Sequence, residues 1–280
     1  MGFTLPILRD WESTRKTLHA YAKVVGSVPR ALASPHPRWW HVSLKVSERG
    51  LQTDRFHSIE NRGVSLQLLM DFHDHAIKIF RNDTLSYQIS MCDGLTVQDL
   101  AEKIEAHLHK IGISVELEIA IFEGTVVGIY NSTVAEDYFR ILTRVEGILK
   151  KVLAKLDGDV GIVNLWPHNF DLAFEWFSEA LIPSEHQNGA SPAQINFGFA
   201  PGDITHARPY FYSNPWPFDE NLTENSLPSG AQWFQQSWQG SLLAYDKVAS
   251  DEAFEEKLEE YFLTIYRLAS PQLSKSMLSR

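Results

Sequence analysis

The stretch VGIVNLWPHNFDLAFEWF, residues 160–177, constrains the fold more than any other part of the chain. Its first seven residues are apolar at nearly every position, which is typical of a strand buried on both faces. Its second half alternates, so that Asp171 and Glu175 fall on one face of a strand and the large apolar side chains on the other. The apolar side chains are Phe170, Leu172, Phe174 and Trp176.

A turn is predicted between these two halves. Pro167 cannot donate a ladder hydrogen bond, and Asn169 tolerates a left-handed backbone. The stretch therefore predicts a hairpin with strands at 160–166 and 170–176.

Helix caps and apolar stripes predict four main helices. Thr96 and Asp99, like Thr133 and Glu136, have the spacing of helix-capping pairs. The expected helices cover about 10–25, 96–111, 133–156 and 250–270. Asp10 is the expected cap of the first helix, Gly26 and Pro29 its expected end, and Pro271 the expected end of the last.

Alternating segments predict antiparallel strands joined by short turns. They lie at about 39–47, 64–71, 76–81, 85–91, 113–121, 193–199, 208–213 and 240–245, in addition to the central hairpin. Helices separated from antiparallel hairpins indicate an α+β fold. We expect a single module over 1–280, possibly with two similar halves at 10–125 and 130–270.

Composition excludes several classes of protein. The net charge of −10 argues against nucleic acid as a main partner. The single cysteine, Cys92, rules out an internal disulfide. No apolar run approaches the ~18 residues of a membrane span, and the N-terminus lacks a signal-peptide pattern. We therefore expect a cytoplasmic protein with no membrane partner.

A set of short motifs, taken in order, resembles an uncharacterised, mainly bacterial family known only as a domain of unknown function. The motifs are Thr17-Leu18-His19, Val25-Gly26, Arg38-Trp39-Trp40-His41, Arg49-Gly50-Leu51-Gln52-Thr53, Phe170-Asp171-Leu172-Ala173, Pro201-Gly202, Pro209-Tyr210-Phe211-Tyr212-Ser213 and Tyr245-Asp246. The chain departs from the family pattern at Ser27, Arg38 and Asn164, where Lys, His and His are usual. The resemblance implies one continuous module and carries no reaction type.

His168 and Asp171 are the candidate catalytic residues. An imidazole and a carboxylate beside a turn suit either a metal half-site or an acid–base pair. The alternative is a turn histidine that faces water and a carboxylate that bonds to backbone. Three residues of separation across a turn do not distinguish these possibilities.

His73 and His75 are further candidate metal ligands, together with His168. A His-x-His pair on one face of a strand can bind zinc. The same pair in a solvated turn between strands, at 72–75, binds nothing. No phosphate-loop, dinucleotide-binding, nucleophile-elbow or zinc-protease motif accompanies these histidines.

Aromatic residues predict a ligand pocket. The candidate lining residues are Trp40, His41, Tyr210, Tyr212 and Trp216. Pocket walls are mostly aromatic and apolar with a few polar groups among them, and the amides between 214 and 239 can supply those groups. A neutral lining of this kind suits an uncharged polar ligand, such as a sugar or a nucleoside. The alternative is a solid sheet core in which the tryptophans anchor proline-rich loops.

Three functions therefore stay open. The leading hypothesis is a protein that binds a small uncharged polar molecule, with no cofactor assigned. The second is a metal-assisted hydrolase that uses His168 and Asp171. The third is a scaffold that forms a homodimer through exposed tryptophans.

Overall fold

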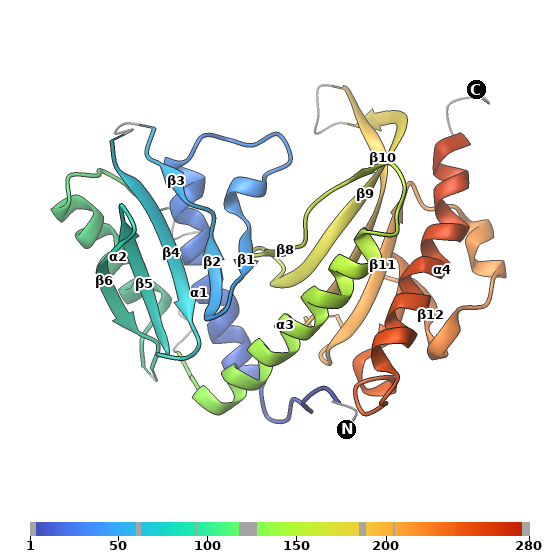
Figure 1. Cartoon of the computed structure of the whole chain (residues 1–280), viewed down its shortest axis with the longest axis horizontal. Coiled ribbons are helices and arrows are strands. Elements are labelled where there is room, and N and C mark those ends of the chain that lie inside the picture. Colours follow the sequence, from blue (N-terminus) through green and yellow to red (C-terminus); the bar gives the residue numbers. More distant parts are fainter. Residues whose placement is uncertain are drawn as a thin grey trace. The chain divides into compact units, whose positions relative to one another are not determined.

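The structure is a computed structural model that describes residues 4–59, 63–92, 94–117, 128–184, 189–203 and 205–275. Its described part contains four α-helices and thirteen antiparallel strands, which confirms the α+β class (Figure 1). The chain divides into two compact units. The N-terminal unit comprises Leu8–Thr143 and Asn164–Phe170, and the C-terminal unit comprises Met1–Ile7, Arg144–Val163 and Asp171–Arg280.

The N-terminal unit is a meander of antiparallel strands that packs against two helices. The strands follow the order β8 (Asn164–Trp166), β1 (Leu44–Val46), β2 (Gly50–Thr53), β4 (Ser65–Asp71), β5 (Ala76–Arg81) and β6 (Thr84–Ser90), and β3 (Phe56–His57) also pairs with β4. Helices α1 (Glu12–Leu32) and α2 (Val97–Lys110) contact each other and the sheet. The predicted stripe of α1, including Leu18, Tyr21 and Val25, is fully buried.

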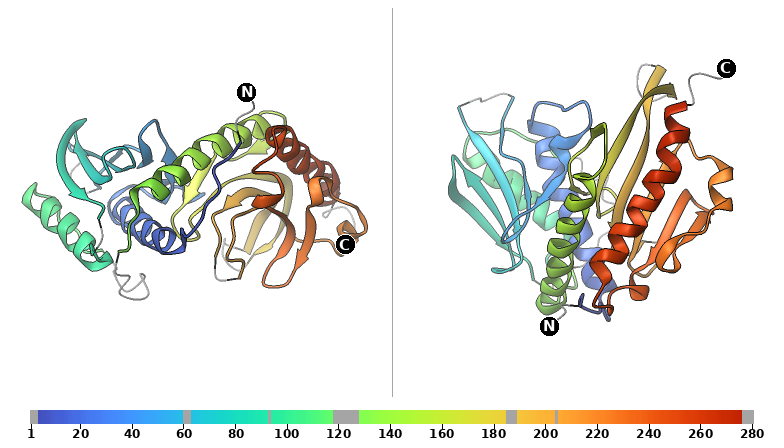
Figure 2. Two further views of the ribbon diagram at one scale, coloured as in Figure 1. Left: turned by 90° about the horizontal axis from the view of Figure 1, so that it is seen from below. Right: turned by 45° about the vertical axis from the view of Figure 1, so that its right-hand side comes forward.

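The C-terminal unit is also built on antiparallel strands. Its strands follow the order β12 (Gln232–Gln235), β13 (Gln239–Ala244), β11 (Tyr210–Trp216), β10 (Gly189–Ala200) and β9 (Asp171–Ser184), and β7 (Asp159–Val160) pairs with β9. Helix α4 (Phe254–Lys275) lies along these strands (Figure 2). The ring of Phe262 in α4 contacts the rings of Phe197 and Phe211 edge-on, so aromatic side chains form the core between α4 and one face of these strands.

Short 3-10 helices connect several strands. They are Trp40–Val42, Glu220–Glu224, Pro228–Gly230 and Tyr245–Lys247. Helix α3 (Ser132–Leu153) contains the boundary between the two units, since Thr143 belongs to one and Arg144 to the other. Among the described helices, none combines the length and the low charge that crossing a lipid bilayer requires.

The helix ends differ from the predictions. Helix α1 continues through Gly26 and Pro29 to Leu32, and its N-cap residue is Trp11 rather than Asp10. Pro29 cannot donate a helical hydrogen bond, but its carbonyl accepts the Ala33 N–H at 2.9 Å, and the helix continues for three more residues. Gly26 does not end the helix. Its missing side chain leaves space for Pro167, because a Cβ at Gly26 would lie 2.8 Å from Cγ of Pro167.

Of the other predicted helix ends, the cap of α2 is confirmed, and the start of α3 and the end of α4 are revised. The capping box of α2 is present, since the hydroxyl of Thr96 accepts the Asp99 N–H at 3.0 Å. At the start of α3, Asn131 Oδ1 accepts the Val134 N–H at 3.2 Å, where the sequence had suggested Thr133. Pro271 lies inside α4 and does not end it.

The predicted strands are also revised at several places. The segment 39–47 is a 3-10 helix followed by the short β1. Residues 113–117 form no strand, and 118–121 lie outside the described residues. Strand β12 was missed, because Gln232–Gln235 alternates too briefly to be recognised.

The central hairpin is divided rather than continuous. The predicted strand 160–166 is two short strands, β7 and β8, and residues 161–163 leave the ladder. Phe170, not Asn169, takes the left-handed conformation (φ 61°), and its N–H bonds to the Trp166 carbonyl at 2.7 Å. Phe170 therefore belongs to the turn and is buried in the N-terminal unit, where its ring packs on Tyr138.

Candidate functional site

Strand β11 carries the best-defined candidate site, on the face opposite α4. Alternation places Tyr210, Tyr212, Asn214 and Trp216 on this face, and we call it the tyrosine face. The exposed fraction of the side chains rises along the strand, from 4% for Tyr210 to 38% for Trp216. The face therefore has a closed end at Tyr210 and an open end at Trp216.

Strand β10 adds polar groups in register with β11. Gln194 pairs with Trp216, Asn196 with Asn214, and Gly198 with Tyr212. Asn196 Nδ2 donates to Asn214 Oδ1 at 3.3 Å, and Asn214 Nδ2 donates to the Gln239 carbonyl. Half-buried amides therefore line the open end of the tyrosine face.

Gly198 makes room for the phenol ring of Tyr212. A Cβ built on Gly198 would lie 2.7 to 2.8 Å from three atoms of that side chain. Real Cβ atoms do not approach other atoms so closely, so Tyr212 lies across bare backbone.

Asp171, at the start of β9, contacts the tyrosine face through Tyr212. Its side chain is buried (5% exposed), and its Oδ2 accepts a short hydrogen bond from the Tyr212 hydroxyl. Burial, and then the Asp171 carboxylate, raise the pKa of Tyr212 well above its usual value. The phenol therefore stays protonated and acts as a donor at neutral pH.

A second tyrosine–carboxylate pair closes the other end of the face. The Tyr210 hydroxyl donates to Asp203 Oδ2 at 2.6 Å, and Asp203 Oδ1 also accepts the backbone N–H groups of Thr205 and His206. Burial, reinforced by Asp203, raises the pKa of Tyr210. Burial works against the charged form of Asp203, but these hydrogen bonds outweigh it and lower the pKa of the carboxyl group.

Trp238, from the loop between β12 and β13, covers part of this face. Its ring stacks on Tyr210 at a centroid distance of 6.4 Å and meets Tyr212 edge-on at 6.1 Å. Trp238 is itself half-buried. The site therefore joins the buried carboxylate of Asp171, the half-buried carboxylate of Asp203, two tyrosines, one indole and a strip of amides.

The predicted lining residues fall into two groups. Tyr210, Tyr212 and Trp216 lie together on the tyrosine face, with the candidate Asp171 beside them. Trp40 and His41 belong to the N-terminal unit, in a separate cluster after α1.

The candidate His168 is exposed in the turn that precedes β9. It belongs to the N-terminal unit, whereas Asp171 belongs to the C-terminal unit. Its backbone carbonyl accepts a hydrogen bond from His19 Nε2 at 3.1 Å, and its ring meets Trp166 edge-on.

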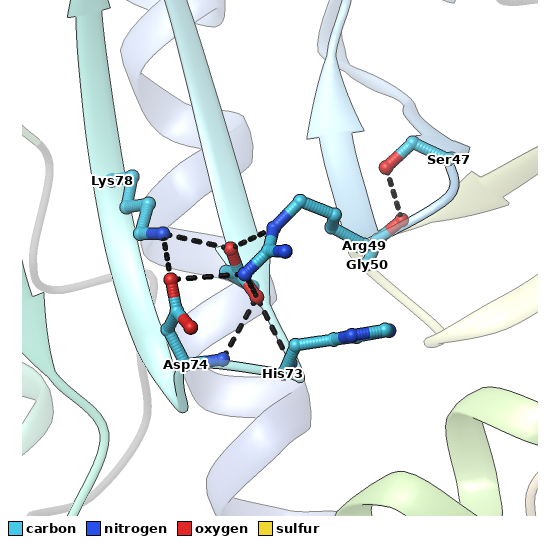
Figure 3. Close-up of polar contacts among 7 residues, drawn as sticks. Ser47, Arg49, Gly50, His73, Asp74 and Lys78 are labelled. Carbon is cyan, nitrogen blue, oxygen red and sulfur yellow. Dashed lines mark hydrogen bonds and ion pairs between the residues drawn. The ribbon is translucent and has the colours of Figure 1, made fainter. Parts of the chain in front are cut away.

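His73 lies in a turn whose polar groups form a closed ion-pair network (Figure 3). The buried Asp71 carboxylate accepts from Arg49 Nε at 2.7 Å and from Lys78 Nζ at 2.9 Å. It also accepts the backbone N–H of His73 at 2.9 Å, and Asp74 pairs with the same two cations. The imidazole of His73 points away from these groups (Figure 3).

His75 has a local partner set of its own. Its Nδ1 lies 2.8 Å from the Tyr130 hydroxyl, and its Nε2 lies 3.2 Å from Glu136 Oε1. Within the residues that the structure describes, no group of three or more histidine, cysteine, aspartate or glutamate side chains could hold a metal ion.

Sequence reasoning missed several residues of the tyrosine face. They are Gln194, Asn196, Gly198 and Asp203. Gly198 interrupts the apolar strand NFGFA, which is a signal for close backbone approach. The partners of Asp203 and Trp238 depend on loops, and local patterns do not predict loop positions.

Comparisons with known proteins agree with the motifs in the sequence. A family of unknown function (DUF5996) matches residues 4–275. Neither the curated proteins nor the solved structures gave a match. Since the match covers both compact units almost from end to end, the chain belongs to this family of unknown function.

Proposed function

We propose that the protein binds a small uncharged polar molecule, such as a sugar or a nucleoside, on the tyrosine face. The observation that carries this proposal is the strip of half-buried amides and aromatic rings above the Asp171–Tyr212 pair. Amide groups both donate and accept hydrogen bonds, so they match hydroxyl and base groups without requiring charge. Aromatic rings favour the flat apolar faces of such ligands.

The open end of the face is the proposed contact surface. Trp216 is exposed and supplies a ring, and Gln194 and Asn196 supply amides from the neighbouring strand. The hydrogen-bonded pairs Tyr212–Asp171 and Tyr210–Asp203 hold the tyrosine rings in place. A rigid surface costs less ordering entropy on binding than a mobile one.

The first test is a thermal-shift screen with glucose, ribose and adenosine as probes, followed by calorimetry on any probe that raises the Tm. We expect Trp216→Ala and Asn196→Leu to weaken binding about tenfold each, since each removes one ring or one amide. The matched control is Trp233→Ala. Trp233 pairs in register with Ser241, whose hydroxyl contacts Tyr261 of α4, so it faces the opposite side of the same sheet.

Two results would reject the proposal. One is a screen in which no neutral probe raises the Tm. The other is a binding affinity that is the same in Trp216→Ala, Asn196→Leu and the control Trp233→Ala.

The predicted homodimer is checked separately by light scattering across a dilution series.

A further inference from the structure

A second cluster of aromatic and basic side chains belongs to the N-terminal unit and is formed by elements other than those of the tyrosine face. We call it the indole–imidazole cluster, and its members are Arg30, His36, Arg38, Trp39, Trp40 and His41. His36 stacks on Trp40 at a centroid distance of 4.6 Å, and His41 stacks on Trp39 at 5.6 Å. The guanidinium of Arg38 lies 5.5 Å from the Trp40 ring and that of Arg30 lies 6.0 Å from the Trp39 ring.

The hydrogen bonds of the two imidazoles determine which nitrogen carries the proton. His41 Nδ1 accepts the backbone N–H of His36 at 3.1 Å, and His36 Nδ1 accepts the backbone N–H of Arg38 at 3.1 Å. A ring nitrogen that accepts a hydrogen bond carries no proton, so each neutral ring is protonated on Nε2. Among the described residues, neither Nε2–H group has a hydrogen-bond partner.

The other polar groups of the cluster are also donors. The guanidinium groups of Arg30 and Arg38 have N–H groups only. The indole N–H of Trp40 is buried and has no hydrogen-bond partner within the described part of the chain. Apart from the two occupied Nδ1 atoms, the side chains of the cluster offer no strong acceptor.

The segment of the chain that contains the cluster is rich in positively charged residues. Residues 13–47 contain no aspartate or glutamate, in a protein whose net charge is −10. The same segment carries six lysine and arginine residues: Arg15, Lys16, Lys23, Arg30, Arg38 and Lys45. Arg30 is exposed and makes no ion pair with any residue that the structure describes. Lys16 and Lys45 pair with Glu12 and Asp54, but the charge of Arg30 is available to a ligand.

The backbone holds the cluster in one arrangement. Pro35 and Pro37 flank His36 and fix their own φ angles. Trp39 adopts a left-handed conformation (φ 58°, ψ 13°), which costs a bulky residue on the order of 1 kcal/mol, and its side chain remains 55% exposed. A strained and exposed tryptophan is typical of a functional surface rather than of a core.

We propose that the indole–imidazole cluster binds the oxyanion of a small molecule, a phosphate monoester or a carboxylate. The Nε2–H groups of His36 and His41 and the guanidinium of Arg30 are the donors, and the anion supplies the acceptors that the cluster lacks. This anionic ligand class differs from the neutral class proposed for the tyrosine face. The two proposals rest on different residues and can fail independently.

The test is NMR of the histidine side chains in protein labelled with 15N, with inorganic phosphate and with succinate as probes. Chloride at the same ionic strength is the reference. We expect a saturable shift of the Nε2–H signals of His36 and His41 with at least one of the two probes. A response to phosphate alone identifies a phosphate site, and a response to succinate alone identifies a carboxylate site.

Two variants test whether the anion binds at the indole–imidazole cluster. We expect Arg30→Gln, which removes an exposed charge, and His36→Phe, which keeps a stacked ring and removes the donor, to weaken binding about five- to tenfold each. Arg55→Gln is the matched control, because Arg55 is an exposed cation of the same unit that pairs with Asp83. The proposal is overturned if neither anion shifts the imidazole signals, or if Arg55→Gln weakens binding as much as Arg30→Gln.

Discussion

Gly198 of β10 lies directly across from Tyr212 of β11, and the phenol ring occupies the space where any other residue would place its Cβ. That Cβ would lie 2.7 Å from Cε1 of Tyr212. The hydroxyl of the same tyrosine reaches the buried Asp171 carboxylate. The absence of a side chain at Gly198 therefore allows the Tyr212 hydroxyl to reach Asp171 on the tyrosine face.

Gly198→Ala is expected to destabilise the protein by about 1–3 kcal/mol, because overpacking forces the Tyr212 ring to move. Urea unfolding measures the change. Gly147→Ala is the control, since a Cβ at Gly147 in the interior of α3 meets nothing within 4 Å. There the gain in helix propensity is expected to stabilise by about 0.5–1 kcal/mol. Equal losses in both variants would contradict the packing argument.

Tyr212→Phe is expected to destabilise by about 1–3 kcal/mol, because it removes a donor from a buried carboxylate. Tyr210→Phe is expected to cost less, since Asp203 keeps its bonds from the Thr205 and His206 backbone. Chemical denaturation of the two variants under the same conditions gives the comparison. If Tyr210→Phe proved the more damaging, the role given to Asp171 would be wrong.

His19 makes stability depend on pH. Burial, followed by the charge of Lys23, lowers the pKa of His19 to about 4, and its Nε2 bonds to the His168 carbonyl. The unfolded chain, with an ordinary pKa near 6.5, binds the proton more tightly than the folded protein. The His19 contribution is therefore complete above about pH 6.5 and falls as the pH drops toward 4, by at most ~3 kcal/mol.

The measurement for His19 is urea unfolding at several pH values between 4 and 7, for the natural protein and for His19→Gln. The glutamine keeps a donor and cannot titrate. We expect a shallower pH dependence in the variant. Parallel curves for the two proteins would show that His19 does not cause the pH dependence.

The Asp71 network predicts a large effect of removing one charge. Burial opposes ionisation of Asp71, but the hydrogen bonds from Arg49, Lys78 and the backbone outweigh it and hold the pKa of this carboxyl group far below its usual range. Asp71→Ala removes the buried carboxylate of the network and its charged hydrogen bonds, while Asp74 still pairs with both cations, and we expect a loss of about 1.5–3 kcal/mol.

The control for Asp71 is Asp83→Ala, which breaks the exposed pair with Arg55. Exposed pairs contribute about 0–1 kcal/mol. Thermal unfolding of both variants makes the comparison. Similar Tm values for Asp71→Ala and the natural protein would show that the network does not stabilise the turn.

Much of the fold could be predicted from the sequence alone. The α+β class, the apolar stripe of α1, the capping box of α2 and the meander at 64–91 follow from local periodicity and from short-range hydrogen bonds. The errors fall where tertiary packing overrides a local rule. Gly26 and Pro29 are helix breakers in isolation, yet α1 passes through both, and Pro167 packs so closely against Gly26 that a Cβ there would clash.

The candidate site shows the same division. The residue types were evident in the sequence, since Asp171, Tyr210, Tyr212 and Trp216 were all singled out. Their partners were not, because Tyr212 meets Asp171 across 41 positions and Trp238 covers both tyrosines from a distant loop. The indole–imidazole cluster was visible only as the letters HPRWWH, and its donor pattern depends on backbone positions that no periodicity encodes.

The fold class, most of the elements and the kinds of chemistry available follow from the amino-acid sequence, because hydrophobic periodicity, helix caps and composition act over a few residues. Which groups share a surface depends on how the strands and loops pack. Strand register placed Gly198 opposite Tyr212, and loop closure brought Asp203 to Tyr210. Such pairings depend on contacts between separate strands and loops, and the periodic pattern of a single element holds no information about them.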